Sequence, residues 1–191
     1  EAFTLRYPGE RGEQLAAENI AVLEGGISFV RENISEQFEH RIEPPAESPP
    51  SVLVNGNQAF CIGAIAGGCR FVSGYPMTPA TTILEFMADK QDDYGIVIKQ
   101  TEDELAAAFG AIGAAHVGAR AMTVTSGGGF CLMVEALGLA GCSETGIVLV
   151  DAQRTGPSTG MPTRTEQGDL EFVIHASHGE FPRCVLAPGS V

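Results

Sequence analysis

The chain has 191 residues, of which 44% are apolar and 18% charged, a composition typical of a globular protein with a full hydrophobic core. Its formal net charge of −13 gives a surface that repels phosphate backbones, so we expect no nucleic-acid partner. Apolar stretches are interrupted before they reach the roughly 18 residues that a membrane span needs, so we expect no membrane partner either.

The N-terminus and the cysteines indicate the cellular compartment of the protein. The N-terminus, beginning at Glu1, has neither an initiator Met nor a signal-peptide pattern, so we expect a cytoplasmic chain that is a piece of a longer one. The cysteines are scattered and form no C-x-x-C pair, which argues against a zinc or iron–sulfur site and for buried, reduced thiols. They are Cys61, Cys69, Cys131, Cys142 and Cys184.

Three regions of different composition follow one another along the chain. Residues 11–34 carry apolar side chains at helical spacing, which predicts an amphipathic helix. Residues 35–51 hold four prolines and few apolar side chains, which predicts an acidic, proline-rich linker. From residue 52 onward, short apolar runs alternate with Ala- and Gly-rich segments, so we expect a separate domain over 52–191.

This last region repeats a strand-then-helix rhythm. The candidate strands are 52–54, 71–73, 96–98, 121–125, 147–151 and 184–186. The candidate helices are 58–67, 79–90, 103–118, 130–140 and 169–175. Such alternation predicts an α/β fold, a parallel sheet with helices on both faces. The sequence stops where another turn and helix would begin, so we expect the domain to be truncated at its C-terminus.

In open α/β sheets, ligands bind in the loops that follow the carboxyl ends of the strands. These loops are predicted at 55–58, 74–78, 100–104, 126–129 and 152–167. We therefore expect the functional residues in these five segments.

The segment "GYPMTPATT", residues 74–82, predicts a stiff strand-to-helix turn. Pro76 and Pro79 have fixed φ angles, and each restricts the residue before it to extended conformations. Pro79 is placed to open the following helix. The hydroxyl of Thr78 would thereby be held at the carboxyl edge of the sheet.

The segment "QTEDE", residues 100–104, places Glu102, Asp103 and Glu104 at the start of an Ala-rich helix. Acidic residues favour the first helical turn, where they cap free N–H groups, and this explains one or two of the three. A carboxylate packed against a helix of small residues would be partly removed from water, the environment that a proton-shuttling Glu needs. Both interpretations stay open on local sequence.

The segment "TSGGGF", residues 125–130, lets a helix begin close to a ligand or to a neighbouring backbone. It is not a dinucleotide-binding G-x-G-x-x-G motif, because Leu132 occupies the position of the third glycine.

Arg154 follows a predicted strand and could bind a carboxylate with two hydrogen bonds, or could pair with a nearby acid.

Three other patterns resemble functional motifs, but their flanking residues do not fit those motifs. The "GPSTG" at 156–160 lacks the strand and helix that flank a nucleophile elbow. His175 and His178 have no third metal ligand at a suitable spacing. "QGDL" departs from the magnesium-binding Gly-Asp-Gly, because Leu170 replaces the last glycine. We therefore expect no metal ligands in this chain.

The segments at 56–87, 100–133 and 146–183, in this order, resemble the pyrimidine-binding domain of the α subunit of 2-oxoacid:ferredoxin oxidoreductases. The resemblance covers essentially all of 52–191, and the loop "QRTGPSTGMPTRTEQGDL" is most similar to the 2-oxoglutarate or branched-chain branch. The helix "RGEQLAAENIAVLEGG", residues 11–26, resembles the last helix of the γ domain that some members fuse ahead of the α domain. The chain would then be a γ-type remnant at 1–34, a linker at 35–51 and the α domain at 52–191.

The resemblance implies a role for each candidate residue. Glu104, with Glu102 as the alternative, would bond the pyrimidine ring of thiamine diphosphate, and Pro76, Thr78, Ser126 and Gly127 would also bind this cofactor. The substrate would be held by Thr78 near its carbonyl and by Arg154 at its carboxylate. The reaction implied is oxidative decarboxylation of a 2-oxoacid, such as 2-oxoglutarate, to its acyl-CoA with reduction of ferredoxin.

The resemblance also implies partners. The diphosphate-binding domain, its magnesium and an iron–sulfur cluster would belong to a β subunit, so the enzyme would be a hetero-oligomer that uses coenzyme A and ferredoxin, and this chain alone would be inactive. A non-catalytic α-type domain, acting as a scaffold or dimerisation partner through the small-residue helix at 105–119, is the alternative. Retention of Thr78, Glu104 and Arg154 favours the enzyme.

Overall fold

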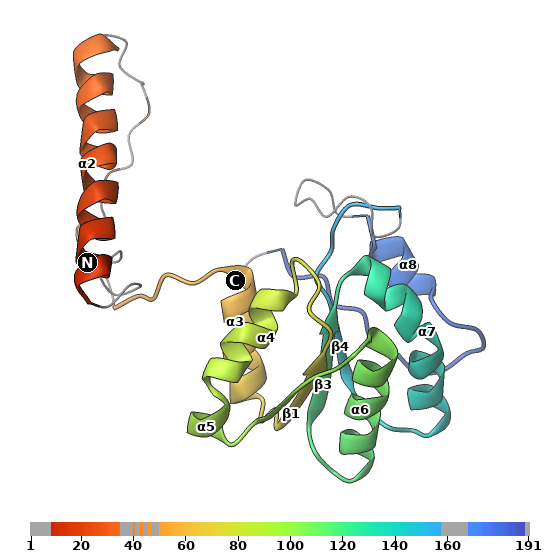
Figure 1. Cartoon of the computed structure of the whole chain (residues 1–191). Helices are drawn as coiled ribbons and strands as arrows, with labels where there is room; N and C mark the ends of the chain where they lie inside the picture. Colours follow the sequence, from red (N-terminus) through yellow and green to blue (C-terminus); the bar gives the residue numbers. More distant parts are fainter. Residues whose placement is uncertain are drawn as a thin grey trace. The chain divides into compact units, whose positions relative to one another are not determined.

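The computed structural model describes residues 9–34, 40, 43, 46, 50–157 and 168–189. The chain divides into two compact units, Glu1–Ser51 and Val52–Val191. Within the first unit, the predicted amphipathic helix is confirmed as α2 (Glu10–Asn33), and most of the predicted linker lies outside the described residues (Figure 1). Large apolar side chains of α2, and that of Ile34 directly after it, are exposed. They are Ile20, Val22, Leu23, Ile27, Phe29, Val30 and Ile34.

The second unit is built on a four-stranded sheet in the order β2-β1-β3-β4, in which all strand pairs are parallel. This confirms the predicted α/β fold (Figure 1). The strands are β1 (Phe71–Gly74), β2 (Val97–Gln100), β3 (Ala121–Thr125) and β4 (Val148–Asp151). Gly74 pairs with Gln100 on one side and with Val124 on the other, while Thr125 pairs with Asp151, so all four strands end at one edge.

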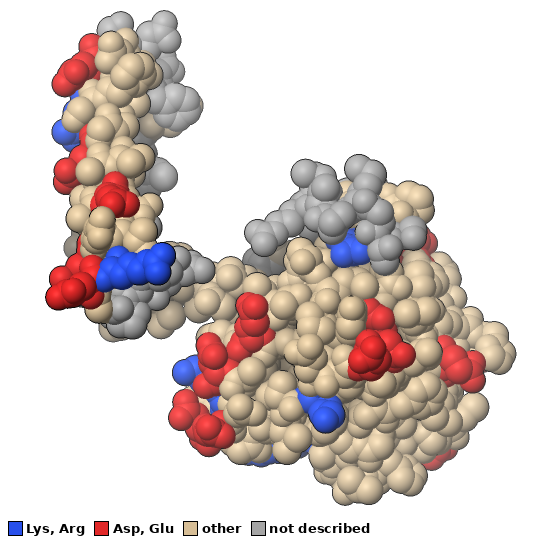
Figure 2. All heavy atoms as spheres, in the orientation of Figure 1, with Lys and Arg blue, Asp and Glu red and all other residues tan. Residues whose placement is uncertain are grey.

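Helices cover both faces of this sheet (Figure 1). One face carries α3 (Gly56–Ala66) and α4 (Thr81–Asp89), followed by the short α5 (Gln91–Tyr94). The other carries α6 (Glu104–His116) and α7 (Gly127–Cys142), with α8 (Leu170–His175) beside α7. The visible face of this unit is mostly uncharged, with acidic side chains at separate points (Figure 2).

The core between the sheet and α3/α4 consists of large apolar side chains. The buried cluster comprises Cys61, Cys69, Val72, Ile83, Leu84, Met87, Ile96, Met122 and Val124. On the opposite face, small residues predominate in the cluster of Ala107, Ala108, Ile112, Met133, Ala136 and Ala140. There the hydroxyl of Ser73 in β1 donates a 2.5 Å hydrogen bond to the Ala107 carbonyl, which ties the sheet directly to the backbone of α6.

Two of the predicted strands are wrong. Residues 52–54 and 184–186 have no strand conformation, and Val52 and Leu53 are 82% and 100% exposed. A short apolar run forms a strand only where a neighbouring edge accepts its backbone hydrogen bonds. Among the described strands, neither segment has such a neighbour.

Three predicted helix starts are shifted by two or three residues. Helix α3 begins at Gly56, two residues before the predicted start. Helix α4 begins at Thr81 rather than at Pro79, because residues 78–80 form a turn and Ala80 is the N-cap. Helix α7 begins at Gly127, three residues before the predicted start. Glycine is a poor helix former, but close contacts at the first turn of α7 leave no room for a side chain.

Candidate active site

The carboxyl edge of the sheet brings together the loops that follow each strand. The loop after β1 contains Pro76 and Thr78, the loop after β2 leads to Glu104, Ser126 follows β3, and Arg154 follows β4. Since β1, β3 and β4 are consecutive neighbours in the sheet, their loops lie next to one another. The segment at 55–58, predicted as a further loop of this kind, instead forms a capping box at the start of α3.

The turn after β1 is held by hydrogen bonds from three other elements. Arg154 Nη1 donates to the Thr78 carbonyl at 3.1 Å, Asn57 Nδ2 to the Pro79 carbonyl at 3.1 Å, and the Thr101 backbone N–H to the Gly74 carbonyl at 3.1 Å. The Thr78–Pro79 peptide bond is cis. Thr78 itself is exposed, so this residue is anchored by its backbone and remains open to a ligand.

The three acidic residues of the "QTEDE" segment lie in different environments. Asp103 is the N-cap of α6 and accepts a 2.7 Å hydrogen bond from the Ala106 backbone N–H, as the capping interpretation predicts. Glu102 is exposed. Glu104 is only 4% exposed, and its Oε1 is buried without a hydrogen-bond partner among the described residues. Of the two candidate glutamates, Glu104 alone has a desolvated carboxyl group.

Glu104 lies against the first turn of α7. A Cβ atom at Gly129 would be 2.6 Å from Glu104 Cγ and 2.7 Å from Glu104 Oε1, so only glycine allows this approach. Ser126, the N-cap of α7, makes no capping hydrogen bond through its side chain, and its Oγ is buried without a partner in the described part of the chain. The "QTEDE" and "TSGGGF" segments therefore meet at one place.

Arg154 is 5% exposed although it lies in an irregular segment. Its Nη1 is bonded to Thr78, while its Nε is buried with no hydrogen-bond partner in the described ranges. Ion pairs of the described residues join Lys90 to Asp93 and His175 to Glu171 but do not include Arg154. The guanidinium group thus keeps a buried donor for a ligand.

Asp169 and Asp151 belong to this edge, although their part in it was not predicted. The Arg154 backbone N–H donates to Asp169 Oδ2 at 3.2 Å, and a Cβ at Gly127 would be 2.6 Å from Asp169 Cγ. Both carboxyl oxygens of Asp151 are buried without partners among the residues described. Burial, with the nearby charge of Asp169, raises the pKa of Asp151 to about 7.

Some of the predicted site residues are linked by hydrogen bonds or close contacts, and others only lie in the same turn. Contacts run from Thr78 through Arg154 and Asp169 to the first turn of α7, against which Glu104 also lies. Pro76 is half-buried in the same turn as Thr78. No local pattern could reveal Asp169 as a neighbour of Arg154, because fifteen positions separate them in the sequence.

The described residues contain no group of three or more His, Cys, Asp or Glu side chains that could hold a metal ion. In the same ranges, no helix is both long and apolar enough to cross a membrane. Part of the "GPSTG" segment, with Ser158, lies outside the described residues.

The cysteines are all free, but the prediction that they are buried is wrong for three of them. Cys131 and Cys142 lie on the outer side of α7, and Cys184 lies in the extended C-terminal segment, where all three are exposed. Cys61 and Cys69 are buried, and burial raises the pKa of the Cys61 thiol to about 11. These two thiols are therefore protonated core residues rather than nucleophiles.

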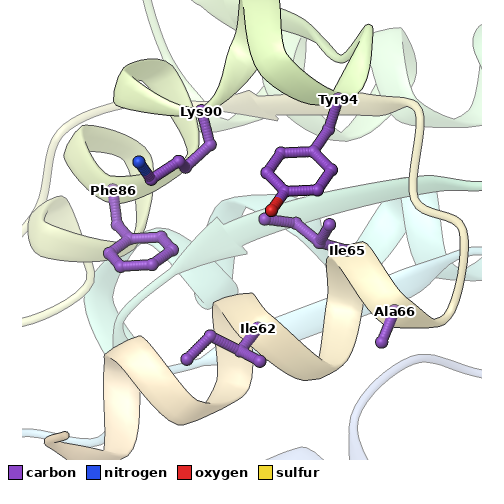
Figure 3. A pocket seen from close by; sticks show the side chains of 6 residues that line it. All are labelled: Ile62, Ile65, Ala66, Phe86, Lys90 and Tyr94. Atoms are coloured by element: carbon purple, nitrogen blue, oxygen red, sulfur yellow. The ribbon is translucent and has the colours of Figure 1, made fainter. Parts of the chain in front are cut away.

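A cavity of about 390 Å³ lies away from this edge, between α3 and the α4–α5 segment (Figure 3). Its walls are Ile62, Ile65, Ala66, Phe86, Lys90 and Tyr94, most of them apolar. These residues lie at the carboxyl ends of helices that lead into β1 and β2, so the cavity faces the amino-terminal edge of the sheet. It is therefore separate from the loops that carry Thr78, Glu104 and Arg154.

Comparison with known proteins places this arrangement in a family. The α subunit of 2-oxoacid:ferredoxin oxidoreductase 1 from Aeropyrum pernix is 44% identical over 173 residues, which cover 85% of this chain and 27% of that protein. The 2-oxoglutarate synthase subunit KorA of Archaeoglobus fulgidus is 48% identical over 139 residues, covering 73% of this chain and 40% of that protein.

A solved structure of 2-oxoglutarate:ferredoxin oxidoreductase from Magnetococcus marinus, with 2-oxoglutarate, coenzyme A and succinyl-CoA bound, superposes with a TM-score of 0.77 at 38% identity. It covers 94% of this chain, which spans 31% of that one. The chain thus spans about a quarter to two fifths of the length of these relatives. Residues 62–191 match the family model described as pyruvate flavodoxin/ferredoxin oxidoreductase, thiamine diphosphate-binding, and the chain therefore belongs to this family.

Proposed function

We propose that this chain is part of the α subunit of a 2-oxoacid:ferredoxin oxidoreductase, in which residues 52–191 bind the pyrimidine end of thiamine diphosphate. The proposed reaction is oxidative decarboxylation of a 2-oxoacid, such as 2-oxoglutarate, to its acyl-CoA with reduction of ferredoxin. The observation that carries the proposal is the presence, at one edge of the sheet, of a buried carboxyl oxygen and a buried guanidinium N–H that both lack partners among the described residues. These are Glu104 Oε1 and Arg154 Nε.

The residues at the first turn of α7 fit an aminopyrimidine ring. Leaving a buried polar group unpaired costs about 1–3 kcal/mol, so a ligand that bonds Glu104 Oε1 and Ser126 Oγ would be favoured. Glu104 would hold a ring nitrogen, while Ser126, Gly127 and Pro76 would line the ring and Thr78 would lie beside it. Thiamine diphosphate, when bound, would supply the electron sink for the decarboxylation of a 2-oxoacid.

Arg154 and Thr78 fit the substrate. One nitrogen of the guanidinium is occupied by the Thr78 carbonyl, which orients the group, and the buried Nε remains to donate to a carboxylate. The same hydrogen bond holds the backbone of Thr78 next to Arg154, so the exposed Thr78 side chain lies near the guanidinium group. Arg154 would bind the carboxylate of the 2-oxoacid, and Thr78 would contact it near the carbonyl.

The proposal extends to the rest of the chain. Residues 1–34 are proposed to be the C-terminal remnant of a γ-type domain, joined by the linker at 35–51 to the α domain at 52–191. In support, the 173-residue alignment with the Aeropyrum pernix subunit is longer than 52–191, whereas the 139-residue alignment with the Archaeoglobus fulgidus subunit is not.

The proposed enzyme is a cytoplasmic hetero-oligomer. A β subunit would carry the diphosphate-binding domain, the magnesium ion and the iron–sulfur cluster, and coenzyme A and ferredoxin would be the other reactants. Both relatives are named as subunits, one of them as an α subunit, which supports a partner subunit.

The proposal is tested by assembling the complete α subunit with its β subunit and measuring 2-oxoacid-dependent reduction of a viologen dye. We expect activity with 2-oxoglutarate or a related 2-oxoacid, and none from this chain alone. Arg154→Ala should raise the KM for the 2-oxoacid at least about tenfold, because a charged hydrogen-bonding partner of the carboxylate is lost. Turnover by the isolated chain, or an unchanged KM in the Arg154 variant, would contradict the proposal.

A further inference from the structure

Asp169 lies where three elements of the proposed site meet. It directly precedes α8, its Oδ2 accepts the backbone N–H of Arg154, and its carboxylate fills the space beside Gly127 at the start of α7. The roles proposed above do not use Asp169. Its contacts nevertheless join the segment that carries Arg154 to the turn against which Glu104 lies.

Arg154 depends on such a contact because the sheet does not hold it. Strand β4 ends at Asp151, and the last hydrogen bond that continues the ladder joins the Ala152 N–H to the Thr125 carbonyl at 2.9 Å. Beyond Ala152 the chain is irregular, and the Arg154 N–H is bonded to Asp169 rather than to a strand. Bidentate recognition of a carboxylate requires a fixed guanidinium, so the backbone that carries it must also be fixed.

Asp169 is itself held independently of Arg154. Helix α8 packs on α7 through Phe172 and Phe130, whose rings lie edge to face with centroids 5.0 Å apart. The Val173 N–H donates to the Asp169 carbonyl at 2.9 Å, which closes the first turn of α8. Asp169 can therefore transmit the position of α7 and α8 to Arg154.

The Asp169 carboxylate bonds the backbone N–H of Arg154 and not its guanidinium group, which affects the charge available to a substrate. An acid paired with the guanidinium of Arg154 would compete with the carboxylate of a substrate for the same donors. Asp169 binds the backbone N–H instead and leaves Nε unpaired within the described structure. It can fix the residue while the positive charge stays available.

We infer that Asp169 is a positioning residue for Arg154 and, through it, for the carboxylate of the 2-oxoacid. This inference rests on the proposed substrate-binding role of Arg154. It predicts that loss of the Asp169 acceptor weakens binding of the 2-oxoacid specifically and has little effect on coenzyme A.

The test uses the complete α subunit assembled with its β subunit. Asp169→Ala should raise the KM for the 2-oxoacid about tenfold, with kcat changed less than about threefold and the KM for coenzyme A unchanged. Asp169→Asn keeps an acceptor oxygen in the same place and should restore most of the lost affinity. Glu171→Gln is the matched control, since it neutralises an exposed acid of α8 whose neighbour is His175 at 3.4 Å.

A double substitution tests whether Asp169 acts through Arg154. If it does, Asp169→Ala should add little to the KM of an Arg154→Ala enzyme, because the group that it positions is already absent. Should the Ala variant fail to assemble, Asp169→Gly provides the same loss of acceptor, since glycine is better tolerated than alanine before a helix.

Three outcomes would overturn the inference. These are an unchanged KM for the 2-oxoacid in Asp169→Ala, an equal rise in the KM for coenzyme A, or additive effects in the double variant. The outcomes also separate the two proposals. An Arg154→Ala enzyme with unchanged KM contradicts the proposed function, whereas a raised KM in Arg154→Ala but not in Asp169→Ala contradicts only the positioning role.

Discussion

The two faces of the sheet bury side chains of very different size and polarity. Toward α3 and α4, β1 and β3 present Val72, Met122 and Val124, which pack against Ile83 and Met87 of α4. Toward α6 and α7, the same strands carry smaller, polar side chains, and α6 meets them with alanines. The polar residues of this second face are Ser73, Thr123 and Thr125, and all three are fully buried.

Because of this difference, we expect one face of the sheet to contribute mainly to stability and the edge of the other face to contribute mainly to activity. Burial of a large apolar side chain contributes about 1.5–3 kcal/mol, so the α3/α4 face supplies more of the hydrophobic stabilisation. Small residues on the other face allow the backbones of α6 and α7 to approach closely, and this closeness puts Glu104 against Gly129. Substitutions on the first face should therefore change stability, and substitutions at the edge of the second should change activity.

The largest expected effect on stability is at Ile83, which is 1% exposed in the α3/α4 core. Ile83→Ala should lower the free energy of unfolding by about 2–5 kcal/mol, because it leaves a cavity in a packed core. Activity per folded enzyme should be preserved. Denaturant unfolding of the assembled enzyme measures the first quantity, and Ile62→Ala, at a position 48% exposed on α3, is the control. A loss of turnover in enzyme that remains folded would contradict the separation of the two faces.

Gly129→Ala should have the largest effect on activity without removing a functional group. Its methyl group would overlap Thr125 Oγ1 and lie 2.6 Å from Glu104 Cγ, so both side chains would have to move, and a misplacement of Glu104 by about 1 Å can reduce turnover about 100-fold. Gly113→Ala in α6 is the control, because a Cβ there meets nothing within 4 Å and should stabilise the helix by up to about 1 kcal/mol. Equal kcat values in the two variants would show that the contact between Glu104 and α7 is unimportant.

Asp151 should make stability depend on pH. Its pKa is raised from 3.8 to about 7, so the folded protein keeps a proton that the unfolded chain has lost. Stability should therefore fall as pH rises from about 4 to 7 and stay lower above that. Asp151→Asn should remove this fall and raise the melting temperature at pH 8 by several degrees. Asp92→Asn, on the exposed side of α5, should keep the wild-type pH dependence; identical profiles for both variants would refute the assignment.

The smallest expected effect is at the N-cap of α6. Asp103→Ala removes the acceptor of the Ala106 N–H and should cost about 1 kcal/mol of stability without changing the KM for the 2-oxoacid. Thermal melting and steady-state kinetics of the assembled enzyme measure the two quantities. A large rise in KM would mean that the capping residue, and not only its neighbour Glu104, contacts the ligand.

The sequence rhythm predicted all four strands of the sheet, because apolar runs buried between helices are a strong signal. It failed for 52–54 and 184–186, since an apolar triplet does not reveal whether a neighbouring strand exists to pair with it. The predicted parallel topology alone was enough to expect ligand-binding loops at the carboxyl edge of the sheet. Which of Glu102 and Glu104 is buried became clear only from the packing of α6 on α7.

Contacts between distant segments were beyond local sequence reasoning. The hydrogen bonds of Asn57 to Pro79 and of Arg154 to Asp169 join residues 22 and 15 positions apart, and no periodicity or motif in the sequence predicts them. The glycines of "TSGGGF" could be interpreted as a sign of close approach, but not as the space for Glu104 and Asp169. Such partners are set by the assembled fold rather than by any one segment.

We propose that Glu104, rather than its exposed neighbour Glu102, is the acid that binds the cofactor. Comparing Glu104→Gln with Glu102→Gln in the assembled enzyme, by 2-oxoacid-dependent viologen reduction at saturating thiamine diphosphate, tests it most directly. We predict at least about a 100-fold loss of kcat in Glu104→Gln, as for removal of a general acid or base, and less than a twofold change in Glu102→Gln. Full activity in Glu104→Gln, or the larger loss in Glu102→Gln, would show that Glu104 does not have this role.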